Sequence, residues 1–210
     1  LRDFTPITEL ASIPLMLVVH SSLPVTNLQE FIAYAKAQPN GVDYATSGPG
    51  TSTHLAAEML RSMTGAPLVH VPFKGNAEVL NALLGGHVDV VASSASTVAP
   101  QLQSNALRLI AVAASKRMAA HPTVPTWREQ GVAANFSNWR GVIGPKGMTP
   151  AQIAFWDDLI GKVVRTDEWT KEVAQYGWEN DYMNSAESRK FLERQHEELK
   201  AILGDLGLAK

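Results

Sequence analysis

The sequence predicts an α/β fold in which mainly parallel strands are joined by helical crossovers. Two observations support this prediction. Apolar runs with strand character alternate with amphipathic helical segments over most of the chain, an order that is typical of a parallel sheet covered by helices. Small polar turns also follow three successive strands, and a helix is expected after each turn. With 45% hydrophobic residues, the 210-residue chain can form one large domain or two modest ones.

The chain begins with an extended segment and a helix. Residues 8–20 contain an apolar run, which we interpret as an extended crossing segment. A helix is expected over residues 27–38, because Asn27 and Glu30 have the spacing of a capping box and Pro39 follows the helix.

Three strand–turn–helix units follow in succession. Their strands cover residues 42–46, 68–73 and 88–92, and their helices cover 54–63, a segment that ends at Leu84, and 98–102. Further strands are expected over 107–113 and 136–143, and later helices over 150–165, 167–176 and 186–203. Trp156 and Trp169 lie at helical positions and are assigned to the core.

The composition excludes several classes of function. Charged residues make up 18% of the chain, the formal net charge is −2 and no basic stripe occurs, so no nucleic-acid partner is expected. The absence of cysteine excludes disulfides, thiol catalysis and thiolate metal sites. The six histidines are scattered without a metal-binding spacing, so neither a metal nor another cofactor is expected. The apolar stretch 13–19 is far shorter than the roughly 20 residues that span a bilayer.

The three turns form the candidate binding site. In a parallel sheet, the turns that follow the strands gather along one edge, where ligands bind. The helix that starts after each turn offers unpaired N–H groups and a partial positive charge to an anion. The candidate residues are Ser47, Gly48, Gly50, Thr51, Ser52 and Thr53 in the first turn, Lys74, Gly75 and Asn76 in the second, and Ser93 and Ser94 in the third.

Alternatives stay open for these residues. Serine, threonine and glycine in such turns also cap helices and fill tight bends without binding a ligand. Lys74 either pairs with a ligand carboxylate or is solvated. His54, in the first turn of its helix, either touches the ligand or packs.

No catalytic motif accompanies the turns. Residues 47–53 lack the Gly-Lys-Ser/Thr ending of a P-loop and the third glycine of a dinucleotide fingerprint. The sequence has no Gly-x-Ser-x-Gly elbow, and no histidine lies near Ser93 and Ser94. A serine hydrolase would therefore need a partner from elsewhere in the chain, and no catalytic residue is predicted.

A set of segments, taken in order along the chain, matches one family. The segments are residues 3–8, 44–58, 71–75 and 83–89, Arg117 with residues 122–126, residues 139–141, and Pro145. This collinear set resembles the receptors of tripartite tricarboxylate transporters, the Bug or TctC-like family. The resemblance implies a periplasmic-binding-protein type II fold with two α/β lobes and a hinged cleft. It also implies a periplasmic protein without catalytic activity, which captures a small carboxylate ligand for the membrane permease subunits of a transporter. The alternative is a sensor that signals to a membrane kinase through the same cleft.

One departure from the family concerns the first lobe. Family members normally begin with a further strand and a Pro/Gly-rich loop, which this sequence lacks. The resemblance therefore implies a complete second lobe, residues 22–136, with the three turns on its cleft side. Residues 1–21 are expected to be a hinge-crossing remnant of the first lobe, and residues 137–210 its returning C-terminal part. The incomplete lobe is expected to hide its apolar surface by self-association of the chain. The alternative is that the missing part is a separate chain that completes the lobe.

Overall fold

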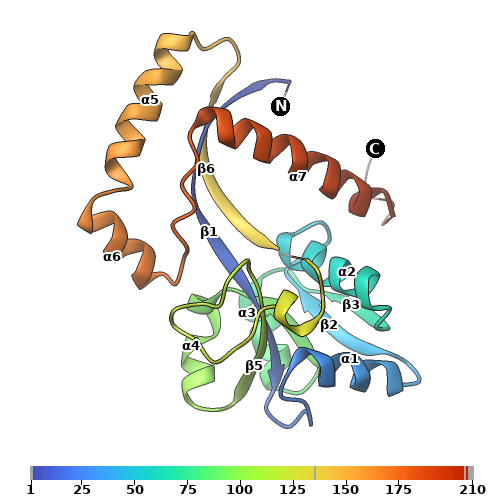
Figure 1. Cartoon of the computed structure of the whole chain (residues 1–210). Helices are drawn as coiled ribbons and strands as arrows, with labels where there is room; N and C mark the ends of the chain where they lie inside the picture. Colours follow the sequence, from blue (N-terminus) through green and yellow to red (C-terminus); the bar gives the residue numbers. More distant parts are fainter. Residues whose placement is uncertain (1, 135, 206, 208–210) are drawn as a thin grey trace. The chain divides into compact units, whose positions relative to one another are not determined.

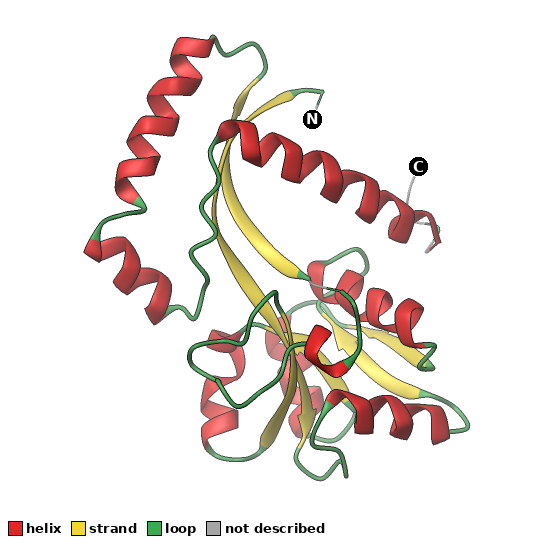
Figure 2. Cartoon of the chain, in the orientation of Figure 1, coloured by secondary structure: helices red, strands yellow, loops and turns green. Residues whose placement is uncertain are grey.

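The computed structural model describes residues 2–134, 136–205 and 207, and the chain forms two compact units (Figures 1 and 2). Unit 1 consists of residues 1–13 and 138–210, and unit 2 consists of residues 14–137. Strand β1 (Phe4–His20) contributes to both units. The division between the units falls inside this strand, after residue 13, whereas the sequence predicts a boundary after residue 21.

The sheet of unit 2 has the strand order β3-β2-β4-β1-β5. Strand β2 (Val42–Thr46) pairs in parallel with β3 (Leu68–Pro72) on one side and with β4 (Val90–Ser93) on the other. Strand β1 runs antiparallel to both β4 and β5 (Leu107–Ala113). The predicted parallel part of the sheet is therefore present, and the antiparallel β1 makes the whole sheet mixed.

Helices cover both faces of this sheet. They are α1 (Leu28–Ala37), α2 (Ser52–Thr64), α3 (Asn76–Leu84), α4 (Ala95–Gln103) and the short helix η1 (Arg128–Gln130). Successive residues of a strand point to opposite faces. Ala45 and Val91 pack in the core formed with α3 and α4, whereas the neighbouring Tyr44 donates its hydroxyl proton to Glu58 of α2 at 2.5 Å.

Two helices of unit 2 start earlier than the sequence predicts. Helix α2 starts at Ser52 and helix α4 at Ala95, two and three residues before the expected positions. Their N-caps are Thr51 and Ser94, whose extended backbone ends each turn. Apolar periodicity detects only the buried part of a helix, so it does not reveal the polar first turn.

The predicted helix cap at Asn27 is confirmed, and Thr149 caps a second helix. The side chain of Asn27 accepts the N–H of Glu30 at 2.9 Å. The carboxylate of Glu30, however, accepts the N–H of Thr26 at 2.7 Å, one residue before the position that a capping box requires. Thr149 and Gln152 form a complete capping box at the start of α5 (Pro150–Val163).

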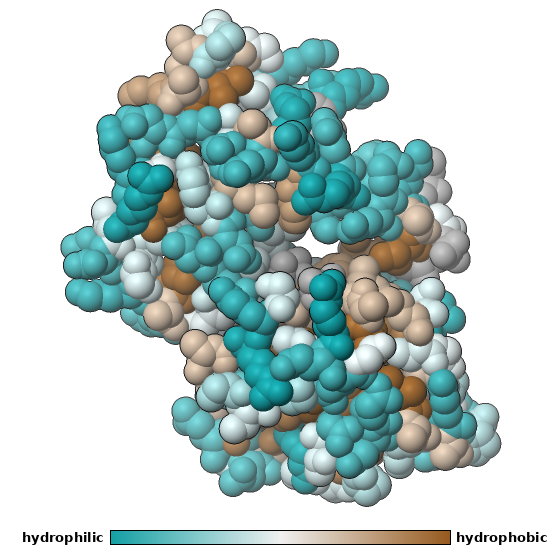
Figure 3. Space-filling model, viewed as in Figure 1, coloured by the Kyte–Doolittle hydropathy of each residue, from teal (hydrophilic) through white to brown (hydrophobic). Residues whose placement is uncertain are grey.

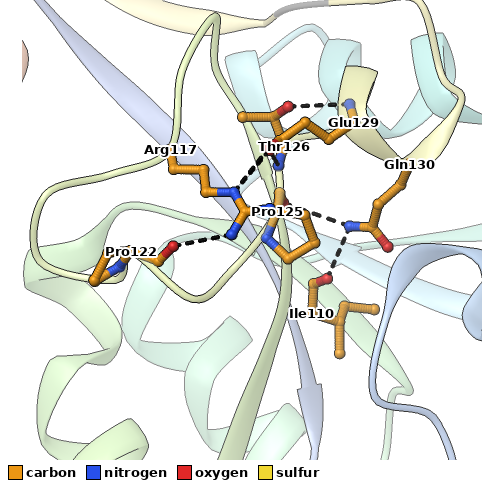
Figure 4. Close-up of polar contacts among 7 residues, drawn as sticks. All are labelled: Ile110, Arg117, Pro122, Pro125, Thr126, Glu129 and Gln130. Carbon is orange, nitrogen blue, oxygen red and sulfur yellow. Dashed lines mark hydrogen bonds and ion pairs between the residues drawn. The ribbon is translucent and has the colours of Figure 1, made fainter.

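The segment after β5 is fastened by side-chain bonds (Figure 4). Arg117 forms an ion pair with Glu129 at 2.9 Å and donates to the carbonyl oxygen of Pro122 at 3.1 Å. Glu129 also accepts the N–H of Thr126 at 2.8 Å, and Gln130 donates to the backbone of β5. The Arg117 segment of the family resemblance therefore holds this loop in place and lies outside the candidate turns.

Unit 1 is built on the first half of β1. This half pairs with β6 (Ser137–Pro145), where the hydroxyl of Thr5 donates to the carbonyl oxygen of Pro145 at 2.8 Å. Helices α5, α6 (Asp167–Gln175) and α7 (Ser185–Asp205) follow. A small core joins Ile7 to residues of α5 and to Trp169, so the predicted inward position of Trp169 is confirmed.

Helix α5 exposes most of its apolar stripe, and Figure 3 shows apolar residues at the surface over this helix. The exposed side chains are Phe155 (62%), Trp156 (41%), Leu159 (40%) and Val163 (44%). The assignment of Trp156 to the core is therefore wrong. The described sheet of unit 1 consists of β1 and β6, and this narrow ribbon covers only the side of α5 that carries Ile160.

Glu9 is a buried carboxyl group in unit 1. Its side chain is 4% exposed, and its Oε2 atom has no hydrogen-bond partner within the described residues. Burial raises the pKa of Glu9 to about 7, and the negative charge of Asp181 adds to the rise. The folded chain therefore holds a proton on Glu9 that the unfolded chain releases at lower pH.

We expect the 210-residue chain to self-associate through the exposed stripe of α5. A contiguous apolar patch is unusual on a soluble monomer, and in the described structure β6 pairs only with β1, which leaves its other edge open. Light scattering over a concentration series should show a mass that rises with concentration. Trp156→Glu should shift the population toward monomer without loss of helicity. Lys171→Gln on α6 is the matched control, and a wild-type chain that stays monomeric throughout would contradict the expectation.

Glu9→Gln should flatten the pH dependence of stability. A carboxyl group whose folded pKa is raised stabilises the fold fully below the unfolded pKa of about 4.5, and this contribution is lost as the pH rises through about 7. At ~1.4 kcal/mol for each pKa unit, the loss in the wild type is up to about 3 kcal/mol. Urea unfolding across this range measures it. Glu193→Gln on α7 is the control, and an unchanged slope in Glu9→Gln would refute the assignment.

Candidate functional site

A small hollow that is partly open to solvent lies at one edge of the unit 2 sheet. Its lining consists of Ala45, Thr46, Ser47, Thr53, Asn76, Val79, Leu80, Val91, Ala92, Ser93, Thr97 and Val98. All of these residues belong to unit 2, so this unit forms the hollow by itself.

Parallel strand pairing brings the walls of the hollow together. Thr46 at the end of β2 is paired with Pro72 at the end of β3, and β4 runs in the same direction on the other side of β2. The carboxyl ends of three strands therefore meet at one edge, and α2, α3 and α4 start there. This is the edge at which the sequence predicts a ligand site.

No side chain caps the three helices that start at this edge. Their N-caps are Thr51, Gly75 and Ser94, and none of these accepts a side-chain hydrogen bond from its own helix. The N-caps of α1, α5 and α6 all accept such a bond. In the described part of the chain, the N–H groups of Ser52 and Thr53 have no acceptor. Side-chain capping therefore does not explain the polar turns, and the N–H groups of Ser52 and Thr53 are available to an anion.

The structure brings together four of the predicted site residues. Ser47, Thr53, Asn76 and Ser93 line the hollow and come from all three turns. The others, Gly48, Gly50, Thr51, Ser52, Lys74, Gly75 and Ser94, are not among the lining residues. Thr51 shapes its turn by donating to the carbonyl oxygen of Gly48 at 2.8 Å.

Lys74 and Ser94 are two of the predicted residues that lie outside the lining. The side chain of Lys74 is exposed, and its backbone N–H donates to the carboxylate of Glu78 at 3.2 Å. The hydroxyl of Ser94 is bonded to that of Thr97 at 2.9 Å, within its own turn. In the described structure, neither Ser93 nor Ser94 shares a hydrogen bond with a histidine, so the arrangement does not support a serine hydrolase.

Thr46 and Thr97 also line the hollow and were missed in the sequence. Thr97 stands three residues after the N-cap Ser94, so its hydroxyl belongs to the first turn of α4. Recognition of Ser94 as the N-cap would have found it. The remaining wall is apolar, with Val79 and Leu80 from α3 and Val91 from β4. The hollow therefore combines hydroxyl and N–H donors with a hydrocarbon surface.

No charged side chain lines the hollow among the described residues. Charges lie beneath the first turn instead, where Glu58 pairs with Arg61 at 2.6 Å and accepts the hydroxyl proton of Tyr44. Burial would raise the pKa of Glu58, but these hydrogen bonds hold it below its usual value. Burial also raises the pKa of Tyr44 and lowers the pKa of His54. The network is thus internally neutral at pH 7.

Among the described residues, no three histidine, aspartate or glutamate side chains stand where they could together hold a metal ion. None of the described helices combines the length and the apolar character needed to cross a membrane.

Comparison with known proteins gives a consistent result. The family model described as "Tripartite tricarboxylate transporter family receptor" matches residues 1–208. A UPF0065 protein of Cupriavidus necator is 36% identical over 209 residues, which is 100% of this chain and 64% of that protein. BugT of Bordetella pertussis is 30% identical over 84% of this chain and 55% of its own length. The chain thus spans less than two thirds of the length of these curated relatives.

Solved structures agree with the sequence relatives. A TctC solute-binding protein from Polaromonas superposes with a TM-score of 0.85 at 27% identity, over 97% of this chain and 70% of that one. An R. palustris protein with adipate superposes with a TM-score of 0.83 at 28% identity, over 99% of this chain and 70% of that one. MatC from Rhodopseudomonas palustris, with bound malate, superposes with a TM-score of 0.69 at 25% identity, over 84% of this chain and 60% of that one. These similarities confirm the expected α/β binding-protein fold, and they extend over 70% of the Polaromonas protein and 70% of the protein with adipate.

Proposed function

Because the chain belongs to the tripartite tricarboxylate transporter receptor family, we propose that it is a periplasmic solute-binding protein. It captures a small carboxylate without catalysis and presents it to the membrane permease subunits of its transporter. The observation that carries this proposal is the hollow at which α2, α3 and α4 start without side-chain caps. Three helix N-termini at one place suit an anion.

The two units take the parts of two lobes in this proposal. Unit 2, residues 14–137, corresponds to the second lobe, and it contains the whole hollow. Residues 1–13 and 138–210, which form unit 1, correspond to parts of the first lobe. The support is that β1 leaves unit 1 and enters unit 2, and β6 returns to pair with β1 in unit 1.

A carboxylate fits the hollow better than a cation or a sugar. Each helix N-terminus contributes about 0.3–1 kcal/mol to binding a negative charge when it is exposed, so three contribute on the order of 1–3 kcal/mol. Ser47, Thr53 and Thr97 add hydroxyl donors, and Val79 and Leu80 offer contact to methylene groups. Relatives that hold adipate and malate support the choice of a small aliphatic carboxylate.

Removal of single hydroxyls should weaken carboxylate binding. Thr53→Val and Thr97→Val keep the side-chain shape and delete one donor each, so adipate or malate affinity should fall about fivefold in each variant, the equivalent of one hydrogen bond of ~1 kcal/mol. Isothermal titration calorimetry on the 210-residue chain measures this. Thr123→Val, in the exposed loop after β5, is the matched control. A preference for a neutral sugar or a cation over both acids would contradict the proposal.

Ester hydrolysis should be absent. With no histidine bonded to Ser93 or Ser94 in the described structure, neither hydroxyl has a base to activate it. The purified chain should hydrolyse p-nitrophenyl acetate at the rate of buffer alone. Activity that disappears in Ser93→Ala or Ser94→Ala, but not in Ser62→Ala on α2, would overturn the non-catalytic proposal.

A further inference from the structure

The first turn of the hollow depends on a small number of bonds. Gly48 and Gly50 have φ angles of 130° and 75°, a backbone region that residues with a side chain rarely adopt. Beyond the Thr51 bond to Gly48, the N–H of Gly50 donates to Nδ1 of His54 at 3.0 Å. Glycine leaves the backbone free to take many conformations, so these bonds decide where the first N–H groups of α2 lie.

The bond to Gly50 fixes the protonation of His54. An atom that accepts a hydrogen bond carries no proton, so neutral His54 holds its proton on Nε2. The ring is 5% exposed and stacks on the ring of His70, with the centroids 4.0 Å apart. Nε2 of His70 in turn shares a hydrogen bond with the hydroxyl of Thr46 at 2.6 Å, and Thr46 lines the hollow.

The titratable and charged groups described around this stack are paired with one another. Tyr44 on β2 stacks on His70 at 5.0 Å, and its hydroxyl donates to Glu58 on α2. Glu58 is neutralised by Arg61, one turn further along α2. Burial lowers the pKa of His54 and of His70 below the ordinary value of 6.5. Both rings are therefore neutral at pH 7, and two protons are disfavoured so close together.

We propose that His54 is a positioning residue of the binding site, whose unprotonated Nδ1 holds Gly50 so that the first N–H groups of α2 stay directed to the ligand. Protonation of His54 turns Nδ1 from an acceptor into a donor, which opposes the N–H of Gly50. The turn is then released and carboxylate binding weakens. This inference rests on the proposed function, because it assigns a role within the same site.

The sign of the pH effect follows from this geometry. Because the pKa of His54 in the folded protein is lowered below 6.5, the ring stays neutral at pH 6.5 and above, and carboxylate affinity is full there. The affinity falls as the pH decreases through the lowered pKa. A histidine that served as a counter-charge for the ligand would act in the opposite direction, because its protonation would strengthen binding. The direction of the change therefore separates the two roles.

Two substitutions of His54 test the proposal. In His54→Asn, the amide oxygen takes the place of Nδ1, accepts the Gly50 N–H and does not titrate. In His54→Leu, a side chain of similar size offers no acceptor. Adipate and malate affinities of the full chain are measured by calorimetry at about pH 7.5 and about pH 5.5, on either side of the ordinary histidine pKa. Protonation of the ligand itself affects all variants equally and cancels in the comparison.

The expected result is that the wild type loses about fivefold more affinity than His54→Asn at the lower pH, and that His54→Leu binds about fivefold more weakly than His54→Asn at both pH values. Equal losses in the wild type and His54→Asn, or stronger binding at low pH, would overturn the proposal. Absence of binding in the wild type at the higher pH would instead count against the proposed function. In that case, hydrogen exchange at the Gly50 amide tests the role of His54. Protection from exchange that disappears at low pH in the wild type, but not in His54→Asn, supports this role. Protection that does not depend on pH rejects it.

Discussion

The parallel pairing of β2 with β3 and β4 is the constraint on which the candidate site depends. Because the three strands run in one direction, their carboxyl ends lie at one edge, and the chain must leave that edge three times through short turns into α2, α3 and α4. Strand β1 runs antiparallel to this group and separates it from β5, and neither β1 nor β5 contributes a residue to the hollow. Strand direction, more than any single side chain, therefore collects the N–H groups that an anion requires.

Placing the charges beneath the site, and not in it, has an energetic reason. A lysine or arginine in the hollow would bind a carboxylate strongly, but in the empty protein it would be a poorly solvated charge that needs a partner. Helix N-termini provide positive potential from groups that are part of the fold already. The ionised pair of Glu58 and Arg61 lies behind the turn instead, where Tyr44 completes its hydrogen bonding. The hollow itself presents neutral donors and hydrocarbon.

The sequence predicts the turns and most helices, because these depend on local chemistry. It identifies Ser47, Thr53, Asn76 and Ser93 as lining residues through their place between a strand and a helix. It misses Thr97, because apolar periodicity places the start of α4 too late, and it does not give the antiparallel direction of β1, because alternation of side chains is the same in both directions. Trp156 is misplaced for a third reason: an apolar stripe shows that a helix face can be buried, while burial itself depends on what packs against it.

The stacked histidines are the part of the site that sequence patterns could not reveal, since His54 and His70 lie on different elements and meet only through the pairing of β2 with β3. Their position allows them to stabilise the glycine-rich turn. Gly48 and Gly50 let a ligand approach the backbone closely, but glycine also raises the entropy lost when the turn is ordered. Rigid neighbours must offset that loss. A buried imidazole that accepts the N–H of Gly50 and stacks on a second ring supplies such support, and it does so only while Nδ1 is free of a proton. A glycine turn that is anchored by histidine is thus ordered by the same bond that makes it sensitive to pH.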